Sequence, residues 1–441
     1  MKKKIIFFLL ILLVNISFLF SGPPEPKGAD FYCPHHYVRL NSLMGVPVNC
    51  DEFLFIGAAA HPGYLIEQGF QRQSRPGYIL SGTIAGYSVY YLLYPFHTKI
   101  QLLANQHLSG QFSPQELQKA ILYGSVYAGF IIVNILILFL SMLLFEQCII
   151  MVSGHWKNKP WLLWMCLALL LSNQVSKTFF WTAHQQMFTL LTPLSCLYAG
   201  INIFRFETGR RKTLLFSFYG GLLFLVYGNF LLLLPTILFS YFLNRKDQQR
   251  LFERSTYLTM ITAIILFFLP IALWIFYLRI IGVTFYSHEF SGFRQFVWIK
   301  DSLEISTSYF LSVLYNNTID FLKTSGSLFL TLLFLVLVTL CSARQKKSET
   351  ITIYASLQRK ENKILLFSFI SSLLFLWLLG YYADRLTFTL SPLILFMAAL
   401  SINKEILNIR IQWAIALFIL ALHLYTIFFT APYLSEKLFF Q

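Results

Sequence analysis

Long runs of apolar residues recur along this chain, and they limit its fold more strongly than any other feature. They begin near residue 5 and continue to about residue 429, with short polar breaks. About 20 apolar residues match the hydrocarbon thickness of a bilayer, where backbone polar groups must be satisfied within helices or a closed barrel. Only 12% of the residues are charged, whereas soluble domains carry about a quarter. The sequence therefore predicts an all-α polytopic membrane protein.

The basic residues lie in short clusters beside the apolar runs and do not form one continuous block. The clusters are Lys2–Lys4, Arg210–Lys212, Arg245–Arg254, Arg344–Lys347 and Arg359–Lys363. Such clusters mark the cytoplasmic ends of membrane spans. The net charge of +15 therefore indicates orientation in a membrane, with lipids and not nucleic acid as partners.

We expect a single transmembrane domain over residues 1–429 with 11–12 helices. Three segments are expected outside the cytoplasm: a first loop at 21–77, a second loop with an interfacial helix at 279–324, and a tail at 430–441. The first apolar run also fits a signal peptide. Because prolines and an acidic residue follow it at 23–25, an uncleaved first helix is favoured.

Local patterns predict where helices begin and break. Ser113, Pro114 and Glu116 form a helix-start signal before the third span. The positions of the basic clusters require a short or re-entrant helix at 161–182. The apolar stretch 213–243, interrupted by the letters YGN, predicts two short helices forming a hairpin.

Three further local predictions concern loops. The Ala/Gly-rich residues 57–60 predict a turn that folds the first loop back. Residues 309–322 predict an interfacial helix, followed by a separate span at 325–341. Cys33 and Cys50 both lie in the first loop and could form a disulfide there. The six cysteines show no spacing typical of a metal site, so no metal ligands are predicted.

The first loop carries the densest group of charged residues outside the basic clusters. Asp51 and Glu52 are adjacent carboxylates, and a carboxylate partly shielded from water at a membrane surface can act as a general base. They can equally begin and cap a helix. Arg72 and Arg75, three residues apart, are expected on one helix face, where they either bind phosphate or anchor the chain at the interface.

Three other places hold candidate substrate-binding residues. Asp384 and Arg385 lie between two apolar runs, where charges are costly unless they are paired or face a polar cavity. They form either part of a site or an ion pair joining two helix ends. His184, His288 and Glu289 either contact substrate or are hydrogen-bonding residues at the interface.

Three stretches of the chain carry a family resemblance. Residues 51–78, DEFLFIGAAAHPGYLIEQGFQRQSRPGY, resemble the D-x-x-x-(Y/F), A-x-x-P and R-P elements of the GT-C superfamily of membrane glycosyltransferases, with Asp51 at the acidic position. Residues 381–396, YYADRLTFTLSPLILF, resemble a late Y-x-x-R element, with Tyr382 and Arg385 matching and Leu386 in place of an aromatic residue. The hairpin at 218–245 is also similar, with Asn229 where an arginine is common.

The resemblance implies a GT-C-like transferase in a bacterial inner membrane, with its site on extracytoplasmic loops. Its donor would be a sugar on a polyprenyl phosphate or diphosphate, and its acceptor a lipid, glycan or protein. Asp51 would be the base of an inverting transfer, and Glu52 is the alternative residue for this role. Arg385, with Arg72 or Arg75, would neutralise the departing phosphate. Members of the superfamily differ in whether they use a divalent cation.

Two other functions compete with this interpretation. A transporter or flippase for lipids or glycolipids needs polar residues at mid-membrane on several spans, whereas the charges here cluster near helix ends. A structural partner in envelope assembly would not depend on any single carboxylate.

Overall fold

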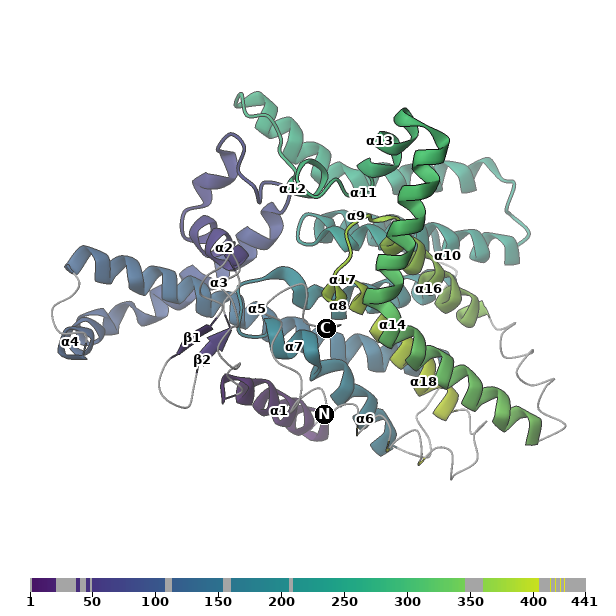
Figure 1. The fold of residues 1–441 in the computed structure, drawn as a ribbon, viewed down its shortest axis with the longest axis horizontal. Helices are drawn as coiled ribbons and strands as arrows, with labels where there is room; N and C mark the ends of the chain where they lie inside the picture. The colour runs from purple at the N-terminus through teal and green to yellow at the C-terminus, as the bar shows by residue number, and fades with distance from the viewer. Residues whose placement is uncertain are drawn as a thin grey trace.

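The computed structural model confirms an almost entirely helical chain (Figure 1). It describes residues 2–20, 37–39, 45–47, 50–107, 113–153, 160–205, 209–345 and 360–403, together with isolated positions 413, 417, 421 and 424. Within these ranges the only strands are two of three residues each, β1 (Tyr37–Arg39) and β2 (Gly45–Pro47), which pair antiparallel. Cys33 and the side chain of Cys50 lie outside the described part, as do the span predicted at 411–429 and the tail at 430–441.

The described part of the chain contains the following helices, in chain order. The α-helices are α1 (Lys2–Ser17), α2 (Cys50–Ala60), α3 (Pro76–Leu93), α4 (His97–His107), α5 (Pro114–Ser153), α6 (Pro160–Leu171), α7 (Gln174–Phe179), α8 (Phe188–Arg205), α9 (Gly209–Phe224), α10 (Leu233–Asp247), α11 (Arg254–Ile280), α12 (His288–Ser291), α13 (Val297–Ile305), α14 (Thr307–Gln345), α16 (Lys360–Leu378), α17 (Asp384–Thr387) and α18 (Ser391–Asn403). Short 3₁₀ turns are η1 (Phe18–Phe20), η2 (Pro62–Ile66), η3 (Tyr94–Phe96), η4 (Gln185–Met187), η5 (Gly228–Leu232) and η6 (Phe388–Leu390).

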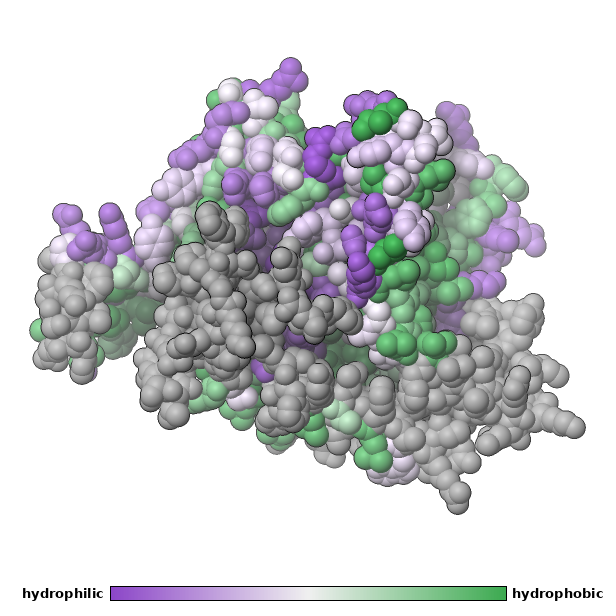
Figure 2. All heavy atoms as spheres, viewed as in Figure 1, coloured by the Kyte–Doolittle hydropathy of each residue, from purple (hydrophilic) through white to green (hydrophobic). Residues whose placement is uncertain are grey.

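In the described part of the chain, four helical segments are long and apolar enough to cross a membrane. They are Gln115–Val152, Gln185–Arg205, Arg254–Ile280 and Glu361–Leu378, and Lys4–Phe20 is a shorter apolar helix. The Gln185–Arg205 segment is largely enclosed by its neighbours, whereas α11 exposes large apolar side chains along its length. Figure 2 shows hydrophobic side chains along α14, and hydrophilic ones gathered at the α12–α13 end. These features indicate a membrane protein, and the full count of 11–12 spans stays a prediction.

Helices α3 and α5 pack closely because glycines line their contact. Gly82 and Gly86 are four residues apart on α3, a spacing that lets membrane helices approach at backbone distance. A Cβ atom added at Gly86 would lie 2.6 Å from the Cα of Val126 on α5. A Cβ atom added at Gly129 would lie 2.4 Å from the backbone nitrogen of Gly86.

The Gly129→Ala variant should therefore be destabilised by about 1–3 kcal/mol, the usual cost of overpacking. Gly124 on the same helix is the matched control, because a Cβ atom there meets nothing within 4 Å. Gly124→Ala should be neutral or slightly stabilising, since alanine favours helix more than glycine does. Thermal unfolding of the purified variants in detergent measures both effects. Equal stability of the two variants would contradict the close approach of α3 and α5.

Several predicted helix ends are confirmed. Ser113 and Glu116 cap each other: the Ser113 N–H donates to Glu116 Oε2 (2.7 Å) and the Glu116 N–H donates to Ser113 Oγ (3.3 Å). The chain breaks between α6 and α7, where Asn173 and Ser176 form a second capping box. The stretch predicted as a hairpin forms two helices, α9 and α10, joined by η5.

Three local predictions are wrong. Residues 57–60 continue helix α2, because the alanine run favours helix and a single glycine costs only about 1 kcal/mol. Residues 309–341 belong to one helix, α14, in which hydroxyls such as that of Thr318 bond to the carbonyl four residues earlier and keep polar residues within it. Arg72 and Arg75 share no helix face, since both precede α3 and the proline at 76 disfavours a helical Arg75.

The first helix packs into the rest of the molecule. Lys4 pairs with Glu146 on α5 (2.6 Å), and the Phe7 ring lies against Trp164 on α6. Asn15 is fully buried, where its side chain donates to the Leu171 carbonyl (3.2 Å) and its own carbonyl accepts from Trp181 Nε1 (3.2 Å). Helix α1 thereby supports the α6–α7 break, which carries one wall of the site described next.

Candidate functional site

The site is built around Asp51, in the first turn of α2. Its Oδ1 forms an ion pair with the guanidinium of Arg72, which the turn before α3 brings back to α2. Its Oδ2 lies 3.6 Å from His184 Nε2, just before η4. The Arg72 guanidinium also lies over the Phe55 ring, one helical turn along α2, at 5.2 Å. Residues more than 130 positions apart in sequence therefore meet at one carboxylate.

The hydrogen bonds of His184 fix its tautomer. Its Nδ1 accepts the backbone N–H of Gln186 (3.1 Å), so this nitrogen carries no proton. Burial lowers the pKa of His184 to about 4, because desolvation outweighs the attraction of Asp51. The ring is therefore neutral at pH 7, and its only proton sits on Nε2, facing Asp51. His184 orients the carboxylate through this N–H.

The charges around Asp51 keep it ionised. Burial alone would raise its pKa, but the nearby N–H of His184 and the positive charges of Arg72 and Arg385 hold the pKa well below its usual range. Arg385 therefore belongs to the same electrostatic group, although α17 lies more than 300 residues further along the chain. The structure thus brings together Asp51, Arg72, His184 and Arg385.

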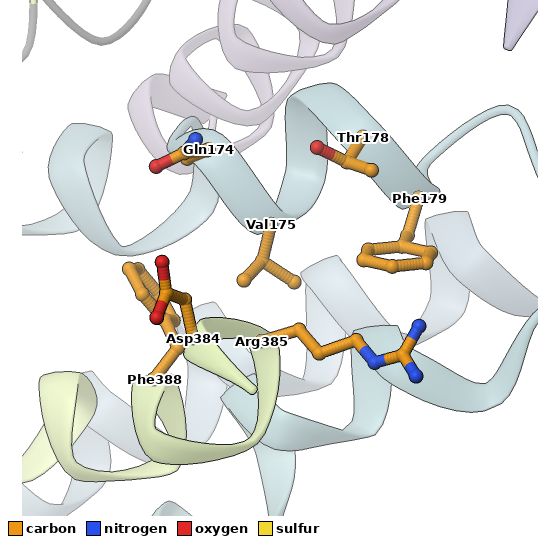
Figure 3. Close-up of a pocket in the computed structure, with 7 residues that line it drawn as sticks. All are labelled: Gln174, Val175, Thr178, Phe179, Asp384, Arg385 and Phe388. Atoms are coloured by element: carbon orange, nitrogen blue, oxygen red, sulfur yellow. The ribbon is translucent and has the colours of Figure 1, made fainter. Parts of the chain in front are cut away.

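A small, half-open pocket with a cavity volume of about 30 Å³ lies beside this group, between α7 and the turn formed by α17 and η6 (Figure 3). Its lining mixes polar and apolar side chains: Gln174, Val175, Thr178, Phe179, Asp384, Arg385 and Phe388. Figure 3 shows Asp384 and Arg385 pointing in different directions, with Arg385 extending past Val175 toward the Phe179 end. The Phe179 ring also packs against His184, with ring centres 5.1 Å apart, so the pocket adjoins the Asp51 group.

Arg75 takes part in a second ion pair, with Glu289. Its Nε and Nη2 donate to Glu289 Oε1 at 3.0 and 2.6 Å, while the hydroxyls of Ser74 and Ser287 donate to Oε2 at 2.9 and 3.0 Å. The Arg75 guanidinium also lies over the Tyr227 ring at 5.6 Å. The sequence placed Glu289 among substrate-binding residues. In the structure both its oxygens are used to join the two loops.

Further hydrogen bonds strengthen this contact between loops. Gln73 is central: its Oε1 accepts from the Tyr286 N–H (2.7 Å), and its carbonyl accepts from Trp274 Nε1 (3.0 Å). Gln68 Oε1 accepts from the Thr284 N–H (2.9 Å). We call residues 68–75 and 284–289, joined in this way, the loop clamp. Arg72, the ion-pair partner of Asp51, lies within the loop clamp. The loop clamp therefore sets the position of Arg72.

The Glu289→Gln variant should loosen the loop clamp, because the amide cannot replace the charge that Arg75 binds. We expect hydrogen exchange at residues 68–75 and 284–289 to speed up about tenfold or more. Glu304→Gln is the matched control, since Glu304 and its partner Lys300 are both exposed. Unchanged exchange in Glu289→Gln would contradict the loop clamp.

The loop clamp should also weaken in acid. Burial alone would raise the pKa of Glu289, but the Arg75 charge and the hydrogen bonds lower it from 4.5 to about 2. The ionised group therefore stabilises the fold above pH 4.5, and this contribution is lost as the pH falls toward 2. The difference in protease resistance between wild type and Glu289→Gln should shrink over the same range.

The remaining predicted site residues lie around this group and not within it. Glu52 is buried and acts electrostatically on Tyr78 and Tyr127, on the inner side of α2. The Tyr382 hydroxyl donates to the Trp377 carbonyl near the end of α16, so it anchors the segment that follows this helix. His288 is hydrogen-bonded to the Tyr286 hydroxyl through Nδ1 (3.2 Å).

The structure also brings in residues that the sequence did not single out. Tyr381 accepts a hydrogen bond from Arg385 Nη2 (3.3 Å), and Gln186 donates to the Arg385 carbonyl (2.7 Å). Tyr227 accepts from Asn229 (3.1 Å) and lies under Arg75. Their signal in the sequence is weak: each is a polar or aromatic residue in a break between apolar runs.

Comparison with protein-family models, with curated proteins and with solved structures finds no match. Within the described ranges, no group of three or more His, Cys, Asp or Glu side chains is placed to hold a metal ion. The function proposed below therefore rests on the residues themselves and on their arrangement.

Proposed function

We propose that this chain is an integral-membrane glycosyltransferase of GT-C type. It moves a sugar from a polyprenyl-phosphate or diphosphate carrier to a lipid, glycan or protein acceptor on the extracytoplasmic side of a bacterial inner membrane. The observation that carries the proposal is the Asp51 carboxylate, fixed between Arg72 and His184 and within the field of Arg385. In this arrangement Asp51 is a fixed proton acceptor, and it lies near the cation of Arg385, which lines the pocket.

In the proposed reaction the acceptor hydroxyl oxygen attacks the anomeric carbon of the sugar. The new bond forms as the bond from that carbon to the carrier phosphate oxygen breaks, and the phosphate leaves with the electron pair. The hydroxyl proton passes to Asp51, which is ionised and held in place by its two partners. Because these partners lower its pKa, Asp51 takes the proton late, once the new bond has made the attacking oxygen strongly acidic. Arg385 stabilises the negative charge that develops on the leaving phosphate. Such a site needs little rearrangement during transfer, since its charges are already in position.

The test uses the purified full chain in lipid nanodiscs with polyprenyl-phosphate sugars and a membrane extract as the source of acceptors. We expect release of bare polyprenyl phosphate and labelling of an acceptor. In a second arm, the chain is placed in sealed vesicles with a fluorescent polyprenyl-phosphate sugar. Movement of the intact donor across the membrane without cleavage would overturn the proposal in favour of a flippase.

A further inference from the structure

The pocket between α7 and α17 combines charged, amide and aromatic side chains. One end carries the carboxylate of Asp384 and the amide of Gln174, and the other end carries the guanidinium of Arg385, with Val175 between them (Figure 3). Two aromatic rings, Phe179 and Phe388, complete its lining. Small-molecule sites combine apolar walls with a few fixed polar groups in this way.

Within this pocket, Asp384 is the carboxylate that lacks a protein partner in the described part of the chain. Among the described residues, no hydrogen bond or ion pair reaches its carboxylate, although it is half-buried. Desolvation raises its pKa to about 6, so the group is ionised at pH 7 but loses hydration that water would give it. Hydroxyl groups donating to its oxygens would restore these interactions.

We propose that this pocket is the sugar subsite of the donor, and that Asp384 and Gln174 are specificity-determining residues that bind hydroxyls of a neutral sugar. This inference rests on the proposed function and names the substrate class of the same site. The orientation follows from the two ends of the pocket: the sugar hydroxyls lie at Asp384 and the carrier phosphate at Arg385. The anomeric carbon then lies near the Phe179 end, which adjoins His184 and the Asp51 carboxylate.

The negative charge of Asp384 also disfavours binding of acidic sugars in this subsite. A uronic acid would place a second carboxylate beside Asp384, and like charges at close range disfavour binding. The pocket therefore selects neutral sugars over acidic ones. Replacing Asp384 with asparagine removes this repulsion and keeps a side chain of almost the same shape.

The experiment measures binding of four carriers to the purified full chain in nanodiscs: polyprenyl phosphate bearing glucose, galactose, mannose or glucuronic acid, each compared with bare polyprenyl phosphate. In wild type we expect at least one neutral sugar to tighten binding about tenfold or more over the bare carrier. Asp384→Asn and Gln174→Ala should remove this gain, which is measured for each variant against its own binding of the bare carrier. Asp384→Asn should also reduce the discrimination against glucuronic acid.

Asp301→Asn is the matched control, since Asp301 on α13 is a partly exposed carboxylate that pairs with the exposed Arg294, away from the pocket. It should keep the full preference for the sugar. The inference is overturned if no neutral sugar tightens binding to wild type, or if the two pocket variants keep the wild-type preference. Sugar transfer by wild type alongside either result would leave the proposed function standing. Sugar-dependent binding without any transfer would instead overturn the function and keep the subsite.

Discussion

Asp51→Asn should reduce sugar transfer by at least about 100-fold while leaving donor binding within a few-fold of wild type. The asparagine side chain keeps the size of the carboxylate and can still accept from His184, but it cannot take the acceptor proton at neutral pH. General-base catalysis contributes about 10²- to 10⁴-fold in enzymes, which sets the expected loss. Transfer of radiolabelled sugar, measured with saturating donor, reports this effect directly.

This substitution also removes the partner of a buried arginine, since Arg72 is only 4% exposed. An unpaired buried charge costs about 3–5 kcal/mol, so thermal stability and donor binding must be measured on each variant. Asp51→Glu keeps the charge and should retain both folding and part of the activity. Asp301→Asn should behave as wild type. An Asp51→Asn protein that folds, binds donor and transfers sugar at the wild-type rate would exclude Asp51 as the base.

The sequence predicted the type of fold because apolar runs and helix-start signals are local. The capping pair of Ser113 and Glu116 involves residues three positions apart, so the order of residues alone reveals it. The errors have local causes as well. The stretch at 57–60 contains a glycine but remains helical, and α14 absorbs polar residues through hydroxyl bonds to its own backbone.

The arrangement of the site could be predicted only in part. Composition and resemblance pointed to Asp51 and Arg385, but nothing local indicated that Arg72 binds Asp51 while Arg75 binds Glu289. That division depends on how the turn before α3 directs two neighbouring arginines toward different helices. The orienting role of His184 depends on a backbone N–H two residues further on, which the sequence does not place in space.

Arg385→Ala should lower the rate of transfer by about 10²- to 10³-fold, the usual cost of removing one group that stabilises developing negative charge. The guanidinium is held by the Tyr381 hydroxyl, and its backbone carbonyl by Gln186, so its position is set before the donor binds. A lysine keeps the charge but not the planar fork of donors. Arg385→Lys should therefore recover only part of the lost rate.

Inhibition by bare polyprenyl phosphate separates a phosphate contact from a general change of charge. This product should inhibit wild type and should inhibit Arg385→Ala at least about tenfold more weakly, because a charge-assisted contact to phosphate has been lost. Arg294→Ala removes the same charge from an exposed position, where the arginine pairs with Asp301. It should leave both transfer and inhibition unchanged. Equal inhibition of wild type and Arg385→Ala would show that the leaving phosphate lies elsewhere, and the transfer mechanism would then lose its cation.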